Sequence, residues 1–161
     1  MKTMNEMKAS QSDPSHGSVY SEKQPAYNRT IHVYETDKDG VVHFSNYFKI
    51  AEEALYSGLR QMGFAFESSE YSMAMINTSA DYIHPIKFAE QLDIVISEIK
   101  VKRVKLVFSI DFKNSQQVSL AKVQLTFVLI DPKDRKAIPV PEQLKLSLSQ
   151  LRNINPTTNG N

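Results

Sequence analysis

The segment from Asp37 to Tyr47 carries the residues best suited to chemistry. It reads Asp-Lys-Asp-Gly-Val-Val-His-Phe-Ser-Asn-Tyr and places a carboxylate on a turn directly before a predicted helix. Backbone N–H groups at the start of a helix have no partner within the helix and carry partial positive charge. They would polarise a thioester or ester carbonyl placed there, and the carboxylate could attack that carbonyl or activate a water. The same spacing also fits Asp37 and Asp39 as plain turn and capping residues.

Several other kinds of site are excluded by the sequence. It contains no phosphate-binding loop G-x-x-x-x-G-K-[ST], no dinucleotide motif G-x-G-x-x-G and no nucleophile elbow G-x-S-x-G. The absence of Cys excludes disulfides and thiolate nucleophiles. The four His residues lack the spacing of a metal site, so we expect no metal.

The charge balance argues against a polyanionic partner. Lys and Arg number 19 against 18 Asp and Glu, which leaves a formal net charge of +1 in 161 residues. Such a chain has no overall attraction to nucleic acid or to an anionic membrane, and we expect neither as a partner. No apolar run approaches the roughly 18 residues of a membrane span, and residues 1–13 lack the apolar core of a secretory signal. We therefore expect a cytoplasmic protein.

The elements that position the Asp37 segment follow from hydrophobic periodicity. We expect a disordered tail over 1–27, a single domain over 28–155 and a flexible end over 156–161. Within the domain we expect strands at 28–36, 73–84, 92–102, 103–113 and 118–130 and helices at 45–62 and 141–151. Ser45 or Asn46 should cap the first helix, Gly63 should end it, and a change of strand phase predicts a bulge near Ser97. One long helix against one antiparallel sheet is an α+β architecture.

The run from Val33 to Phe48 resembles the signature of the 4-hydroxybenzoyl-CoA thioesterase family. The pattern D-x-x-G-[VI]-V, followed after three residues by N-Y, is carried by Asp37, Gly40, Val41, Val42, Asn46 and Tyr47. The resemblance covers roughly residues 28–140 and includes Tyr82-Ile83-His84-Pro85, which is similar to the family's strand end before a Pro turn. It implies the hot dog fold, a long central helix wrapped by a curved antiparallel sheet of about five strands.

The resemblance also implies an activity, the hydrolysis of an acyl-CoA thioester to a free acid and CoA. The family's catalytic Asp, a nucleophile or a general base, falls on Asp37, and its carbonyl-polarising N–H falls on Phe44. The implied substrate-binding residues are Gly40, Val41, Val42, His43, Asn46 and Tyr47, and the local candidates for CoA binding are Lys102, Arg103 and Lys105. Water is the second substrate, no cofactor is implied, and the assembly is a homo-oligomer, either a dimer or a homotetramer. Many family members carry His where this chain has Phe44, so the acyl preference stays open.

Three alternatives bear on this interpretation. A hydratase of the same fold needs His five residues after its Asp, whereas His43 comes six residues after Asp37. Another thioesterase branch places its acid on the helix, where Glu52 and Glu53 are available, although we expect both to be ion-paired or solvated. A non-catalytic module that binds acyl-CoA or an acyl carrier is the third alternative. We also expect Asp39 to point to solvent rather than to act on Asp37.

Overall fold

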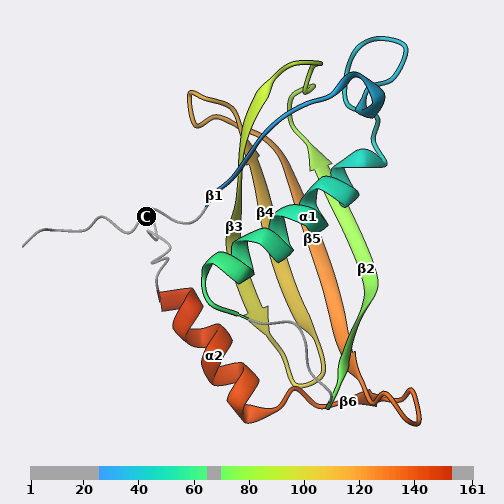
Figure 1. Cartoon of the computed structure of the whole chain (residues 1–161), viewed down its shortest axis with the longest axis vertical. Coiled ribbons are helices and arrows are strands. Elements are labelled where there is room, and N and C mark those ends of the chain that lie inside the picture. The colour runs from blue at the N-terminus through green and yellow to red at the C-terminus, as the bar shows by residue number, and fades with distance from the viewer. Residues whose placement is uncertain (1–25, 65–69, 154–161) are drawn as a thin grey trace, which may run out of the picture.

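The computed structural model describes residues 26–64 and 70–153. Its sheet has six antiparallel strands in the order β1-β3-β4-β5-β2, with β6 beside β5, and two α-helices accompany it (Figure 1). The elements are β1 (Ala26–Thr30), the 3-10 helix η1 (Val33–Glu35), α1 (Asn46–Gln61), β2 (Ser72–Tyr82), β3 (Gln91–Val101), β4 (Leu106–Lys113), β5 (Ser119–Ile130), β6 (Ala137–Ile138) and α2 (Glu142–Asn153).

Helix α1 lies across one face of the sheet (Figure 1). Its buried residues recur every three or four positions, which is the spacing of one helix face: Tyr47, Ile50, Ala51, Ala54, Leu55, Gly58 and Leu59. A Cβ at Gly58 would lie 2.9 Å from Ile96 Cδ1, so a small residue is needed where the helix meets β3. Gly58 thus lets α1 lie close against the sheet.

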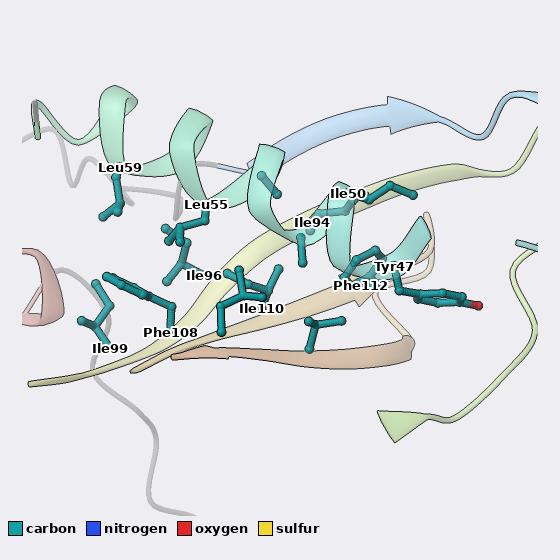
Figure 2. Close-up of a cluster of buried hydrophobic side chains, with 14 of the residues drawn as sticks. Tyr47, Ile50, Leu55, Leu59, Ile94, Ile96, Ile99, Phe108, Ile110 and Phe112 are labelled. Atoms are coloured by element: carbon teal, nitrogen blue, oxygen red, sulfur yellow. The ribbon is translucent and has the colours of Figure 1, made fainter. Parts of the chain in front are cut away.

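Alternate residues of the central strands complete the core beneath α1 (Figure 2). Phe108, Ile110 and Phe112 of β4 are each at most 1% exposed. Phe108 meets Phe127 of β5 edge to face at 5.9 Å between ring centroids. Each such side chain contributes about 1.5–3 kcal/mol by leaving water. At the far end of this layer, Tyr47 packs 5.7 Å from Phe112 and anchors the first turn of α1.

Two predicted strands are shorter in the structure. The strand predicted at 28–36 ends at Thr30, because the chain turns into η1 and the Glu35 carboxylate accepts the His32 N–H. The strand predicted at 103–113 begins only at Leu106, because the Lys102 N–H donates to the Lys105 carbonyl and closes a hairpin there.

The other expected elements are present within two residues of their predicted bounds. The register of β3 against β4 shifts between Ile96 and Glu98, which confirms the bulge near Ser97. Gly63 follows α1 with φ +79°, as expected of a glycine that ends a helix. Strand β6 was not predicted, since two residues give no periodicity. The predicted tail and C-terminal segment lie almost wholly outside the described residues, although β1 already includes Ala26 and Tyr27.

The overall prediction of an α+β chain with one antiparallel sheet is confirmed, with a sixth short strand and the 16-residue α1 on one face. Neither helix in the described part of the chain is long and apolar enough to cross a membrane.

Candidate active site

Asp37 begins a tight turn that its own carboxylate helps to close. The Asp37 N–H donates to the Val41 carbonyl at 2.8 Å, and the Gly40 N–H donates to the Asp37 carbonyl at 3.1 Å. Asp37 Oδ1 accepts the Asp39 N–H at 2.8 Å and the Val41 N–H at 3.4 Å. No residue in the described ranges donates to Oδ2, so this oxygen is available for chemistry.

The other acidic residue of the turn has a different environment. The Asp39 carboxylate pairs with Lys38 at 2.9 Å and its side chain is 66% exposed. This confirms that Asp39 points to solvent. Gly40, between the two, has φ +76° and no atom within 4 Å of the place where a Cβ would lie. The turn therefore needs glycine for its backbone conformation, not for lack of space.

The start of α1 presents a backbone donor beside this turn. The His43 N–H donates to the Glu35 carbonyl at 2.9 Å, and the Asn46 N–H donates to the His43 carbonyl at 2.9 Å. The Phe44 N–H, between them, has no acceptor among the described residues. The predicted side-chain cap is wrong: Ser45 occupies the N-cap position without a capping hydrogen bond, and its Oγ instead lies 2.9 Å from His43 Nδ1.

A cavity of about 500 Å³ joins the turn and the helix start. Its lining residues are Asp37, Val41, Val42, His43, Phe44, Tyr47, Tyr82, Ile83, His84 and Pro85. The Tyr82 ring meets Tyr47 edge to face at 4.9 Å, and the Tyr82 hydroxyl donates to the Phe44 carbonyl at 3.3 Å. The structure thus brings together Asp37, Phe44 and four of the predicted substrate-binding residues, with aromatic walls around them.

The segment Tyr82 to Pro85 was not predicted as part of the site. The sequence indicated this segment only as a strand end before a Pro turn, and it begins 45 positions after Asp37. Its place in the cavity follows from β2, which ends beside the start of α1 (Figure 1).

Tyr47 forms the inner wall of the cavity and is 3% exposed. Burial raises the pKa of its phenol, and a hydrogen bond with the Ile86 backbone offsets part of that rise. The Tyr47 side chain is therefore a neutral wall of the cavity rather than a source of charge.

Some predicted site residues lie elsewhere. Neither Gly40 nor Asn46 lines the cavity, and the Asn46 amide donates to the Glu35 carbonyl at 2.8 Å. Lys102, Arg103 and Lys105 occupy the β3–β4 hairpin, at the opposite end of the sheet from the Asp37 turn (Figure 1). Within one chain these basic side chains do not reach the cavity, and their role in CoA binding stays a prediction.

The acidic residues of α1 are also accounted for. Glu53 pairs with Arg29 of β1 at 3.2 Å, which confirms the expected ion pair. Glu52 lies beside the Tyr56 hydroxyl and raises the pKa of that phenol, although burial is the larger cause. Neither glutamate lines the cavity that contains Asp37.

A comparison with known protein families shows the family of this chain. The family model described as the thioesterase-like superfamily matches residues 31–148, which contain the whole cavity. The chain belongs to the thioesterase-like superfamily. This match confirms the predicted thioesterase class. Membership of the narrower 4-hydroxybenzoyl-CoA thioesterase family is not confirmed.

Proteins similar in sequence to this thioesterase are named as acyl-CoA hydrolases. A 1,4-dihydroxy-2-naphthoyl-CoA hydrolase of Picosynechococcus sp. is 30% identical over 127 residues, which span 72% of this chain and 86% of that protein. One of Microcystis aeruginosa is 28% identical over 137 residues, spanning 81% of this chain and 97% of that protein. The prediction of an acyl-CoA thioesterase is confirmed by such relatives.

Solved structures show the same fold as this thioesterase. A 1,4-dihydroxy-2-naphthoyl-CoA thioesterase from Synechocystis superposes with a TM-score of 0.69 at 20% identity, over 78% of this chain and 96% of that one. A Staphylococcus aureus protein solved in complex with CoA superposes with a TM-score of 0.73 at 12% identity, over 84% and 88%. At these identities the likeness establishes the hot dog fold alone.

Proposed function

We propose that this thioesterase hydrolyses an acyl-CoA thioester to a free acid and CoA at the Asp37 cavity. The observation that supports this proposal is the pairing of an available carboxylate oxygen, Asp37 Oδ2, with an available backbone donor, the Phe44 N–H, on the wall of one cavity. A carbonyl bound between them would be polarised on one side and open to attack on the other.

Two routes use the same oxygen. As a general base, Asp37 takes a proton from water while the water oxygen bonds to the carbonyl carbon. As a nucleophile, Asp37 itself bonds to that carbon, and water then hydrolyses the resulting anhydride. In both routes the Phe44 N–H stabilises the oxyanion, and the C–S bond breaks to release the CoA thiolate, which takes up a proton. Water is the second substrate, and we propose no cofactor.

We propose further that the acyl group is aromatic. Phe44, Tyr47 and Tyr82 present ring edges and faces to the cavity, and flat aromatic groups pack well against such walls. The naphthoyl-CoA specificity that the named relatives carry is consistent with this preference.

The proposal includes a homodimer formed through β2. In the described part of the chain this strand pairs only with β5, so its other edge is open. Ile76 on the strand and Ile83 just beyond it are each about half exposed. Two-fold pairing of antiparallel β2 edges would bury this apolar surface and extend the sheet.

Such a dimer would also supply what the single chain lacks. Antiparallel pairing sets the end of one sheet that carries Lys102, Arg103 and Lys105 on the same side as the Asp37 end of its partner. This arrangement is how those side chains would approach the phosphates of CoA. A homotetramer and a cytoplasmic location stay predictions from the sequence.

Release of free thiol from a panel of acyl-CoAs tests the proposal. Asp37→Asn keeps the size of the side chain but removes its basicity and nucleophilicity, so we expect kcat to fall by about 10²–10⁴-fold. Asp39→Asn is the matched control in the same turn and should retain activity. Benzoyl-CoA or naphthoyl-CoA should be hydrolysed with a higher kcat/KM than acetyl-CoA or palmitoyl-CoA. A wild type that binds acyl-CoA without hydrolysing any would favour the alternative of a non-catalytic binding module.

A further inference from the structure

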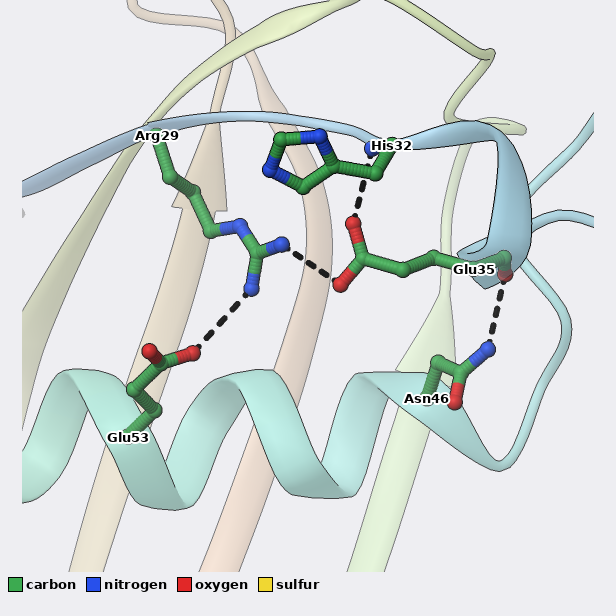
Figure 3. A network of polar contacts seen from close by, with 5 residues as sticks. All are labelled: Arg29, His32, Glu35, Asn46 and Glu53. Carbon is green, nitrogen blue, oxygen red and sulfur yellow. Dashed lines mark hydrogen bonds and ion pairs between the residues drawn. The ribbon is translucent and has the colours of Figure 1, made fainter.

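Glu35 is a buried carboxylate just before the Asp37 turn. It is only 7% exposed, and its two oxygens are both engaged: one pairs with the Arg29 guanidinium, and the other accepts the His32 N–H at 2.8 Å (Figure 3). Arg29 in turn reaches Glu53 on α1 at 3.2 Å. The Glu35 side chain is thereby fixed to β1 and, through Arg29, to the middle of α1.

The backbone of the same residue is bound to the start of α1. The Glu35 carbonyl accepts two hydrogen bonds. One comes from the His43 N–H at 2.9 Å, and the other from the Asn46 side-chain amide at 2.8 Å (Figure 3). Asp37 follows Glu35 by two positions, and Phe44 follows His43 directly. The Glu35 carbonyl therefore links the chain segment that carries Asp37 to the segment that carries the Phe44 N–H.

We infer that Asn46, Glu35 and Arg29 are positioning residues that fix the Phe44 N–H relative to the Asp37 carboxylate. The inference rests on the proposed function, because it assigns these residues a part in the same reaction. None of the three lines the cavity, so each acts through the backbone that it holds. A displacement of about 1 Å between reacting groups can reduce a rate about 100-fold, which makes such bonds matter for catalysis.

Helix capping does not explain the Asn46 side chain. A capping side chain accepts a hydrogen bond from a backbone N–H of the first helical turn. The Asn46 amide instead donates, and it donates backwards to a residue eleven positions earlier. The bond thus ties α1 to η1 rather than completing the helix.

Asn46 is the residue on which this inference can be tested with least damage to the fold. Replacing Arg29 would leave the buried Glu35 carboxylate without its cation, and replacing Glu35 would leave Arg29 with Glu53 alone, so either change would cost stability. Asn46→Asp keeps the shape of the side chain but replaces its donor with a negatively charged acceptor, whereas Asn46→Ala removes the donor without adding a charge. An acidic residue in the first turn of a helix is favourable, so Asn46→Asp should not weaken α1 itself.

We expect Asn46→Asp and Asn46→Ala each to lower kcat by about 10- to 100-fold while KM stays within about twofold. Asn114→Ala is the control: it removes an Asn whose side chain accepts the backbone N–H groups of Gln116 and Val118 in the β4–β5 turn, none of which lines the cavity. It should lower the melting temperature without changing kcat. A raised KM with unchanged kcat in the Asn46 variants would overturn the inference in favour of direct substrate contact.

A second measurement is independent of turnover. Amide hydrogen exchange at His43, in the full chain, should become at least about tenfold faster in Asn46→Ala, whereas exchange at Leu55 in the middle of α1 should not change. An inactive wild type would overturn the proposed function before any variant is compared. An active wild type whose Asn46 variants keep both kcat and His43 protection would overturn the positioning role alone.

Discussion

Replacing Gly40 by Ala tests whether this glycine serves only the stability of the fold or also the geometry of the Asp37 carboxylate. Gly40 lies between Asp37, the proposed catalytic acid, and Val41, both of which line the cavity, and it has φ +76° with open space around the missing Cβ. Gly63, at the end of α1, has φ +79° and the same open space. Both positions therefore require the same left-handed backbone conformation, but only Gly40 belongs to the Asp37 turn.

The expected loss of stability is similar at both positions. An L-residue in the left-handed region costs about 1–2 kcal/mol. Ala also restricts the unfolded chain, which returns about 0.4–1 kcal/mol of that cost. The net loss is about 1 kcal/mol for each variant, which corresponds to a fall of about 3–4 °C in melting temperature for a domain of this size. Asn in place of Ala should restore part of the loss, since Asn tolerates this region better.

Activity should distinguish the two variants. The Gly40 N–H closes the Asp37 turn at 3.1 Å, and the Gly40 carbonyl accepts the Phe88 N–H at 3.0 Å. If Ala relaxes φ, both bonds shift and Asp37 moves with them, so we expect kcat/KM to fall about tenfold or more. Gly63→Ala should keep wild-type kcat/KM. Thermal unfolding and thiol release on both variants check this. Equal kcat/KM in the two variants would refute the reasoning that Gly40 sets the geometry of the acid.

Two further predictions concern stability at high pH and assembly. Because burial raises the pKa of Tyr47, the folded state holds this proton more tightly than the unfolded state, so stability is full below about pH 10 and is lost as the pH rises further. Urea unfolding from pH 8 to 11 should show this decline, and Tyr47→Phe should make it shallower; an unchanged slope would contradict the assignment. Ile76→Lys places a charge on the exposed part of β2 and should convert the proposed dimer to monomer in light scattering, with kcat/KM falling in parallel. A dimer that persists with full activity would place the interface elsewhere.

The sequence predicted the elements whose periodicity extends over several turns or pairs. The stripe from Tyr47 to Leu59 and the alternation along β4 and β5 each repeat often enough to indicate element and face. The prediction failed where a few hydrogen bonds determine the local structure. The stretch after Thr30 alternates like a strand, yet it folds into η1 because Glu35 binds back to His32. Such a contact leaves no periodic signal.

The site was predictable to the extent that it is a local motif. Asp37, Val41, Val42, His43, Phe44 and Tyr47 share one short stretch, and the structure places all of them on one cavity. The remaining wall, Tyr82 to Pro85, comes from the end of β2, and no local pattern connects it with Asp37. Asn46 belongs to the motif but not to the cavity wall, because its side chain bonds to Glu35.

The rigidity of the motif is also not local. The Val42 N–H donates to the Ile86 carbonyl at 2.8 Å, and Val41 pairs with Lys87. These contacts hold the Asp37 turn from the segment after β2, while Glu35 and Arg29 hold it from β1 and α1. A short peptide with the same residues would have the acid and the donor but would pay the conformational entropy of bringing them together at every turnover. The sheet and α1 therefore supply what the local sequence cannot, since they hold the Asp37 carboxylate and the Phe44 N–H on the wall of one cavity before any substrate binds.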